Sequence, residues 1–179
     1  MRPFEGAPLA LAAGIVFSAI LLVAAIGDLR TRRIPNKLVV VLGALGMAYG
    51  VARAPIIPGL IHSGGGLLVG LACWLPFYLL GWLGAGDVKL YAAAGAWLGA
   101  ARAAEGAVVG ALFGALLSLI WMVKSFGMKE TAQTLGMAAA APEMLTPSSG
   151  SSKRSTLPYG VAIAFGALWA AWMPRILNV

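Results

Sequence analysis

Asp28 and Asp87 are the only two aspartates of the chain, and they are the residues best suited to chemistry. Asp28 follows the first long apolar stretch, and Asp87 stands in "GAGDVKL", behind Gly84 and Gly86. Ionisable groups at a membrane boundary are costly unless they are solvated, paired or functional. Two neighbouring carboxyl groups share one proton, so one can accept a proton from water while the other donates to a peptide carbonyl. The pair therefore predicts peptide hydrolysis.

Each aspartate also has a simpler explanation. Asp28 can be a juxtamembrane acid that pairs with arginines in the following loop, "RTRR". Asp87 precedes an apolar segment, where aspartate is a favoured N-cap. Both fall on the same predicted membrane face, however, which favours the interpretation of a shared site.

The composition indicates a membrane protein. Of the 179 residues, 60% are hydrophobic and 11% are charged, whereas about 25% of the residues of a soluble domain are charged. One cysteine, Cys73, and one histidine, His62, give no cluster for a metal site, so we expect no metal and no cofactor. We interpret the net charge of +7 as a sign of membrane topology and expect no nucleic-acid partner.

Six apolar segments are long enough to cross a bilayer. They predict an all-α, polytopic membrane protein with a single membrane-embedded domain over residues 1–179. A tight turn is expected at 102–105, where Arg102 and Glu105 stand beside a glycine. The segments are 7–27, 37–53, 64–83, 88–104, 105–123 and 157–175.

Alternation of these segments places 28–36, 84–87 and 124–156 on one side of the membrane. That side, with the adjoining helix ends, carries nine of the 13 lysines and arginines. The positive-inside rule makes it cytoplasmic and leaves both termini outside. Residues 124–156 are then a cytoplasmic loop, which is either a plain linker or a loop that contacts substrate.

Residues around the aspartates suggest local roles. Gly84 and Gly86 allow a positive φ and the close approach of a substrate backbone. Pro35 suits the loop into the second segment, and Asn36 is expected to be the N-cap of that helix.

Three motifs in this order resemble the type IV prepilin peptidases, membrane aspartyl proteases of the GxGD class. They are "DLRTRRIPNKL" (28–38), "GAGDVKL" (84–90) and "LPYGVAIAFGAL" (157–168). The resemblance implies that Asp28 and Asp87 are catalytic and cut the basic leader from pilin-like precursors at the cytoplasmic face of the bacterial inner membrane. It also implies supporting roles for Gly84, Gly86, Lys89, Pro35, Asn36, Pro158, Tyr159 and Gly160.

The sequence departs from the larger members of that family. Those carry a further cytoplasmic portion with paired cysteines that bind zinc, and they methylate the new N-terminus. This chain has no CxxC, so it resembles the short branch associated with Flp or tight-adherence pili. Archaeal preflagellin peptidases are short as well, and the substrate stays open between them.

Three alternatives remain. A signal-peptide-peptidase or presenilin type of GxGD protease is disfavoured, because Gly27 precedes Asp28 and no Pro-Ala-Leu occurs. A small cation-coupled transporter would place its acids near the bilayer midplane rather than at the edge. A scaffold would use both aspartates as ordinary surface groups.

Overall fold

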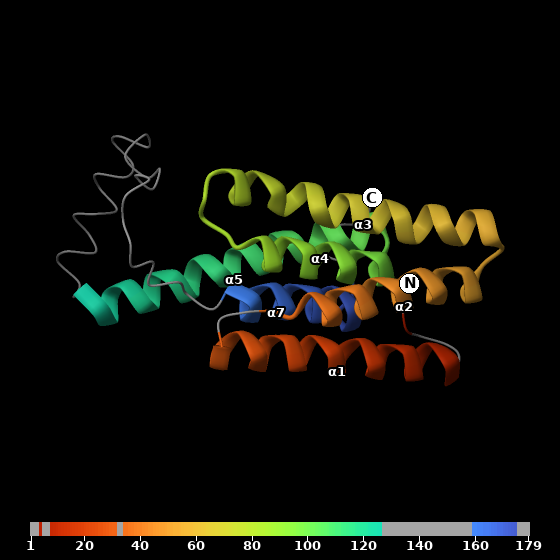
Figure 1. Ribbon diagram of the computed structural model, residues 1–179, viewed down its shortest axis with the longest axis horizontal. Coiled ribbons are helices and arrows are strands. Elements are labelled where there is room, and N and C mark those ends of the chain that lie inside the picture. Colours follow the sequence, from red (N-terminus) through yellow and green to blue (C-terminus); the bar gives the residue numbers. More distant parts are fainter. Residues whose placement is uncertain (1–3, 5–7, 32–33, 127–158, 175–179) are drawn as a thin grey trace.

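The computed structural model describes residue 4 and residues 8–31, 34–126 and 159–174. Within these residues the fold is entirely helical, as predicted, with no strand (Figure 1). The helices are α1 (Pro8–Thr31), α2 (Asn36–Arg53), α3 (Ile56–Leu79), α4 (Ala85–Leu98), α5 (Ala100–Phe126) and α7 (Tyr159–Trp172).

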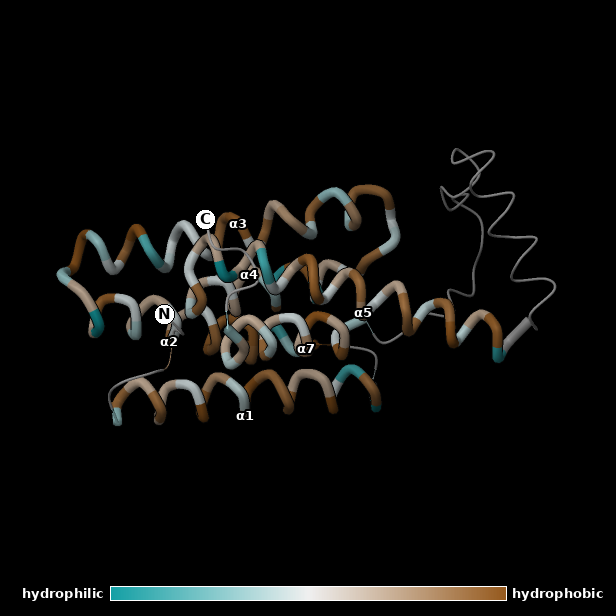
Figure 2. Tube along the Cα trace, turned by 180° about the vertical axis from the view of Figure 1, so that it is seen from behind, coloured by the Kyte–Doolittle hydropathy of each residue, from teal (hydrophilic) through white to brown (hydrophobic). Residues whose placement is uncertain are grey.

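The six helices alternate in direction along a common axis (Figure 1). The end of α1 and the beginnings of α4 and α7 therefore lie at the same end of the bundle, which we call the aspartate end. The helices α1, α3 and α5 are long and apolar enough to cross a membrane, and α7 is a shorter apolar helix. The hydrophilic positions of α1 gather at its C-terminal end, at the aspartate end (Figure 2).

The helix α4 forms the centre of the bundle and contacts α2, α3, α5 and α7. Residues 90–99 are all buried, because alanine and glycine make this helix narrow enough to be surrounded. Lipid gives no hydrophobic drive for helix association, so close backbone approach and internal hydrogen bonds must hold the bundle. At Gly95 a Cβ would lie about 2.2 Å from the carbonyl oxygen of Gly66 in α3, which leaves room for glycine alone.

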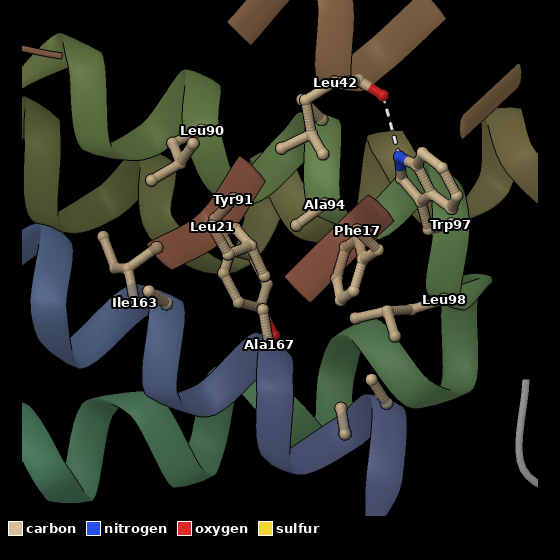
Figure 3. Close-up of a cluster of buried hydrophobic side chains, with 14 of the residues drawn as sticks. Phe17, Leu21, Leu42, Leu90, Tyr91, Ala94, Trp97, Leu98, Ile163 and Ala167 are labelled. Carbon is tan, nitrogen blue, oxygen red and sulfur yellow. Dashed lines mark hydrogen bonds between the residues drawn. The ribbon is translucent and has the colours of Figure 1, made fainter. Parts of the chain in front are cut away.

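Two hydrogen bonds tie the central helix to its neighbours. The Trp97 indole N–H donates to the carbonyl oxygen of Leu42 in α2 over 2.8 Å (Figure 3). The Tyr91 hydroxyl donates to the carbonyl oxygen of Ala103 in α5 over 2.7 Å. Both are buried, where an unmade hydrogen bond is most costly.

The third predicted segment was placed too late in the sequence. It was expected at 64–83, with 54–63 as an external loop, but α3 begins at Ile56. Pro55 is the N-cap and Pro58 lies in the first turn, where a proline breaks no helical hydrogen bond. Pro55 and Pro58 therefore mark the start of a helix.

The predicted turn at 102–105 is also wrong. The chain reverses at Gly99, whose φ of 76° is in the left-handed region, and α5 begins at Ala100. Arg102 and Glu105 lie inside α5 and are buried. They form an ion pair of 2.9 Å, and Arg102 also donates to the carbonyl oxygen of Met173, just beyond α7. These charges are tolerated in the interior because they neutralise each other.

Candidate active site at the aspartate end

Asp28 lies in the last turn of α1 and is buried, with 7% of its surface exposed. Its carboxylate oxygen Oδ2 accepts a hydrogen bond of 2.9 Å from the backbone N–H of Gly160. Gly160 is the second residue of α7, so this N–H has no partner within its own helix. The N-terminus of a helix carries partial positive charge and stabilises an anion. The hydrogen bond and the helix N-terminus therefore both stabilise a negative charge on Asp28.

Gly160 has no room for a side chain. A Cβ there would lie 2.7 Å from Asp28 Oδ2. The α7 backbone can reach the carboxylate only because this residue is glycine, so the "YG" of the third motif holds the aspartate of the first.

Asp87 lies in the first turn of α4, before the apolar part of that helix. Its Oδ2 accepts a hydrogen bond of 3.3 Å from the backbone N–H of Gly84, which is the N-cap residue. Asp87 was considered as the N-cap itself, but it is the third residue of the helix and bonds back to the cap position. A Cβ at Gly84 would lie 3.1 Å from the same oxygen, so a larger residue there would require the Asp87 carboxylate to shift.

The carboxyl groups of Asp28 and Asp87 interact electrostatically. Burial and, next, the negative charge of Asp28 together raise the pKa of Asp87 from 3.8 to about 7, against the opposing effect of the hydrogen bond from the Gly84 N–H. A charge acts in this way only over a short range. The structure thus brings together two residues that are 59 positions apart (87 − 28).

Comparison of the sequence with models of known protein families identifies the family of this chain. A sequence model described as the type IV leader peptidase family matches residues 15–128. The chain belongs to this family. The match includes both aspartates and ends before α7. No curated protein and no solved structure matches the chain.

The motif residues of this leader peptidase fall into two groups. Gly84 and Gly160 lie against the two aspartates, and Gly86 directly precedes Asp87, where a Cβ would contact Ile34 at 3.5 Å. Neither Gly84, with a φ of −79°, nor Gly86, inside α4, has the positive φ that was expected. The positive φ angles occur at Gly81 and Gly99. Gly81 lies in the α3–α4 connection, so the glycine with a positive φ precedes the "GAGD" motif.

The other group is exposed. Lys89, Pro35 and Asn36 all face outward. Pro35, and not Asn36, is the N-cap of α2, and it makes no side-chain capping bond. Asn36 is the first residue of the helix, because the extended backbone of Pro35 already sets the helix start. Pro158 lies outside the described residues.

One contact at this end of the leader peptidase was not foreseen. Tyr159, the first residue of α7, lies with its hydroxyl 3.0 Å from Ser118 Oγ in α5. Both residues line a groove of about 240 Å³ between α5 and α7, together with apolar side chains that include Leu117 and Trp121. A serine in an apolar helix gives no sequence signal for such a contact.

The described residues of the peptidase contain no group of three or more histidine, cysteine, aspartate or glutamate side chains that could hold a metal ion. Among the described residues, the backbone N–H groups of Gly84 and Gly160 donate hydrogen bonds to the two carboxyl groups.

Proposed function

We propose that this leader peptidase is an aspartic endopeptidase in which Asp28 and Asp87 form the catalytic pair. The observation that carries the proposal is the asymmetry between the two carboxyl groups. Asp28 accepts the N–H of Gly160 at a helix N-terminus, which suits a base. The pKa of Asp87 is raised to about 7 by burial and by the charge of Asp28, which suits an acid.

The reaction begins with ionised Asp28 and protonated Asp87. Asp28 takes a proton from water as the water oxygen attacks the peptide carbonyl carbon, and Asp87 gives its proton to the carbonyl oxygen. The product is a neutral tetrahedral diol. Asp28 then passes its proton to the amide nitrogen, the C–N bond breaks, and Asp87 recovers a proton from a diol hydroxyl. Both carboxyl groups return to their starting states, so the cycle needs no further reactant.

The proposed substrate is a pilin-like precursor whose basic leader precedes an apolar helix. Both aspartates lie at helix ends, where a bond beside a membrane-inserted helix can reach them. The apolar groove between α5 and α7 adjoins Gly160 through Tyr159 and offers a surface for such a helix. Acids at the end of the bundle favour this function over cation transport, which uses acids near the midplane.

The proposed orientation places the aspartate end at the cytoplasmic face of the bacterial inner membrane, with both termini outside. Among the described residues, this end carries Arg30, Lys37, Lys89 and Lys124, whereas the opposite end carries Arg53 and Arg102. Arg102 is neutralised by Glu105. The difference in positive charge supports a cytoplasmic aspartate end.

The test is cleavage of a purified leader-bearing pilin precursor by the detergent-solubilised wild type and by Asp28→Asn and Asp87→Asn. Asparagine keeps the shape and can still accept the backbone N–H bonds, but it cannot exchange the proton. We expect kcat/KM to fall at least about 1,000-fold in each variant, as for loss of an essential acid or base. Cleavage near the wild-type rate by either correctly folded variant contradicts the proposal.

A further inference from the structure

At each end of α7, an aromatic side chain of this helix contacts a serine hydroxyl of a neighbouring helix. At the aspartate end, Tyr159 of α7 contacts Ser118 of α5. At the opposite end, the Trp172 indole N–H of α7 donates to Ser18 Oγ of α1 over 3.0 Å. Each serine in turn donates to the carbonyl oxygen of the glycine four residues earlier, over 2.8 Å in both cases.

The proton count fixes the direction of the bonds at the aspartate end. A serine hydroxyl has one proton, and Ser118 gives it to the carbonyl oxygen of Gly114, which can only accept. The contact of 3.0 Å with Tyr159 therefore uses the tyrosine proton. The chain of bonds runs from the Tyr159 hydroxyl through the Ser118 hydroxyl to the backbone of α5. Such a chain strengthens each of its members.

This chain of bonds holds Tyr159, which directly precedes Gly160, the residue whose N–H bonds Asp28. Tyr159 and Gly160 are consecutive in the first turn of α7, and the Gly160 N–H bonds the Asp28 carboxylate at 2.9 Å. The site has little freedom to adjust, because a Cβ at Gly160 would already lie 2.7 Å from Asp28 Oδ2. A shift of the α7 start relative to α5 would thus move the N–H away from the carboxylate.

We propose that Ser118 and Tyr159 are positioning residues of the peptidase, which fix the start of α7 so that the Gly160 N–H holds Asp28 in its catalytic position. This inference rests on the proposed function. The device at the other end, Ser18 with Trp172, fastens the same helix by the same chemistry far from the aspartates. It serves stability alone.

The experiment compares Ser118→Ala and Tyr159→Phe with Ser18→Ala as the matched control, all in the full-length solubilised protein. Ser118→Ala and Ser18→Ala each remove one serine acceptor from one aromatic donor of α7. We expect both to lower the thermal unfolding temperature to a similar extent. We expect only Ser118→Ala and Tyr159→Phe to lower kcat, by about tenfold, because misplacement of a catalytic group slows the chemical step. KM should change by less than about twofold, because both substitutions keep the apolar lining of the α5–α7 groove that we propose for the substrate helix.

Two further variants separate positioning from general damage. The double variant Ser118→Ala/Tyr159→Phe should be no slower than either single variant, because one chain of bonds is lost in all three. Ser118→Thr keeps a hydroxyl that can bond the same carbonyl, and it should restore most of kcat.

The inference is overturned if Ser118→Ala and Tyr159→Phe retain wild-type kcat, or if Ser18→Ala loses as much kcat as they do. It also fails if the two single losses multiply in the double variant. These outcomes are distinct from failure of the proposed function, which would appear as activity in Asp28→Asn. With Asp28→Asn inactive and Ser118→Ala fully active, only the positioning role is lost.

Discussion

Each end of the helical bundle carries an acid with a second charged residue beside it, but the neighbours differ in sign. Glu105 is buried 2.9 Å from the Arg102 guanidinium and is neutralised by it. Asp87 lies within reach of another carboxylate, Asp28, whose charge helps to raise the pKa of Asp87 to about 7. An opposite charge makes a buried acid a structural element, whereas a like charge leaves it ready to exchange a proton.

The two ends also differ in the cost of their charges. A buried ion pair is costly to break, because removing one partner leaves the other uncompensated. A carboxylate that is desolvated and close to a like charge destabilises the fold in its ionised form. The arrangement at the aspartate end thus lowers stability, as is common for active sites and as the proposed function requires.

Neutralising one charge at each end is expected to change the free energy of unfolding in opposite directions. Arg102→Met leaves Glu105 buried without its partner and removes the bond to the Met173 carbonyl, so we expect a loss of about 3–5 kcal/mol. Asp87→Asn removes the unfavourable ionised form, and we expect a gain of about 1–3 kcal/mol at pH 8. Thermal unfolding in detergent measures both.

The sign of the Asp87 effect depends on pH. Its pKa rises from 3.8 to about 7 in the folded protein, so the folded state binds more protons than the unfolded state between these values. The stability of the wild type should therefore fall as pH rises from about 4 to about 7 and level off above that range. Asp87→Asn should lack this decline. A lower unfolding temperature for Asp87→Asn than for the wild type at pH 8 contradicts the contrast between the ends.

A pair of glycine substitutions tests how closely the aspartate end is packed. Gly160→Ala puts a Cβ 2.7 Å from Asp28 Oδ2, whereas a Cβ at Gly27, next to Asp28 in α1, meets nothing within 4 Å. We expect Gly160→Ala to lower kcat about 100-fold, since misplacement by about 1 Å is enough for such a loss. Gly27→Ala should retain wild-type kcat. Equal activity of the two variants would show that the close contact with α7 does not position Asp28.

The sequence was sufficient to predict the helical fold and to place both aspartates at the same end of the bundle. Asp28 and Asp87 could be found because a carboxylate in an apolar chain is rare and the apolar segments place both at the same end. The error at 102–105 arose because one partner lies far away in the sequence. Arg102 and Glu105 suggested a surface turn, yet they neutralise each other in the interior, and Arg102 also bonds the carbonyl oxygen of Met173 beyond α7.

The supporting residues were harder to predict for a related reason. Gly160 could be predicted as part of a motif, but its bond to Asp28 joins residues 132 positions apart. Ser118 could not be predicted, because a serine within an apolar helix ordinarily bonds its own backbone. It does so here as well, and its additional role appears only when α7 packs beside α5.

The central claim is that one aspartate is ionised and the other protonated when the peptide bond is attacked. The most direct test is the pH dependence of kcat/KM for precursor cleavage by the wild type, which reports the ionisation of the free enzyme. Asp87 must hold its proton and has a pKa of about 7, so activity should fall tenfold per pH unit above about 7. A constant or rising kcat/KM between about pH 6 and pH 9 would contradict the account.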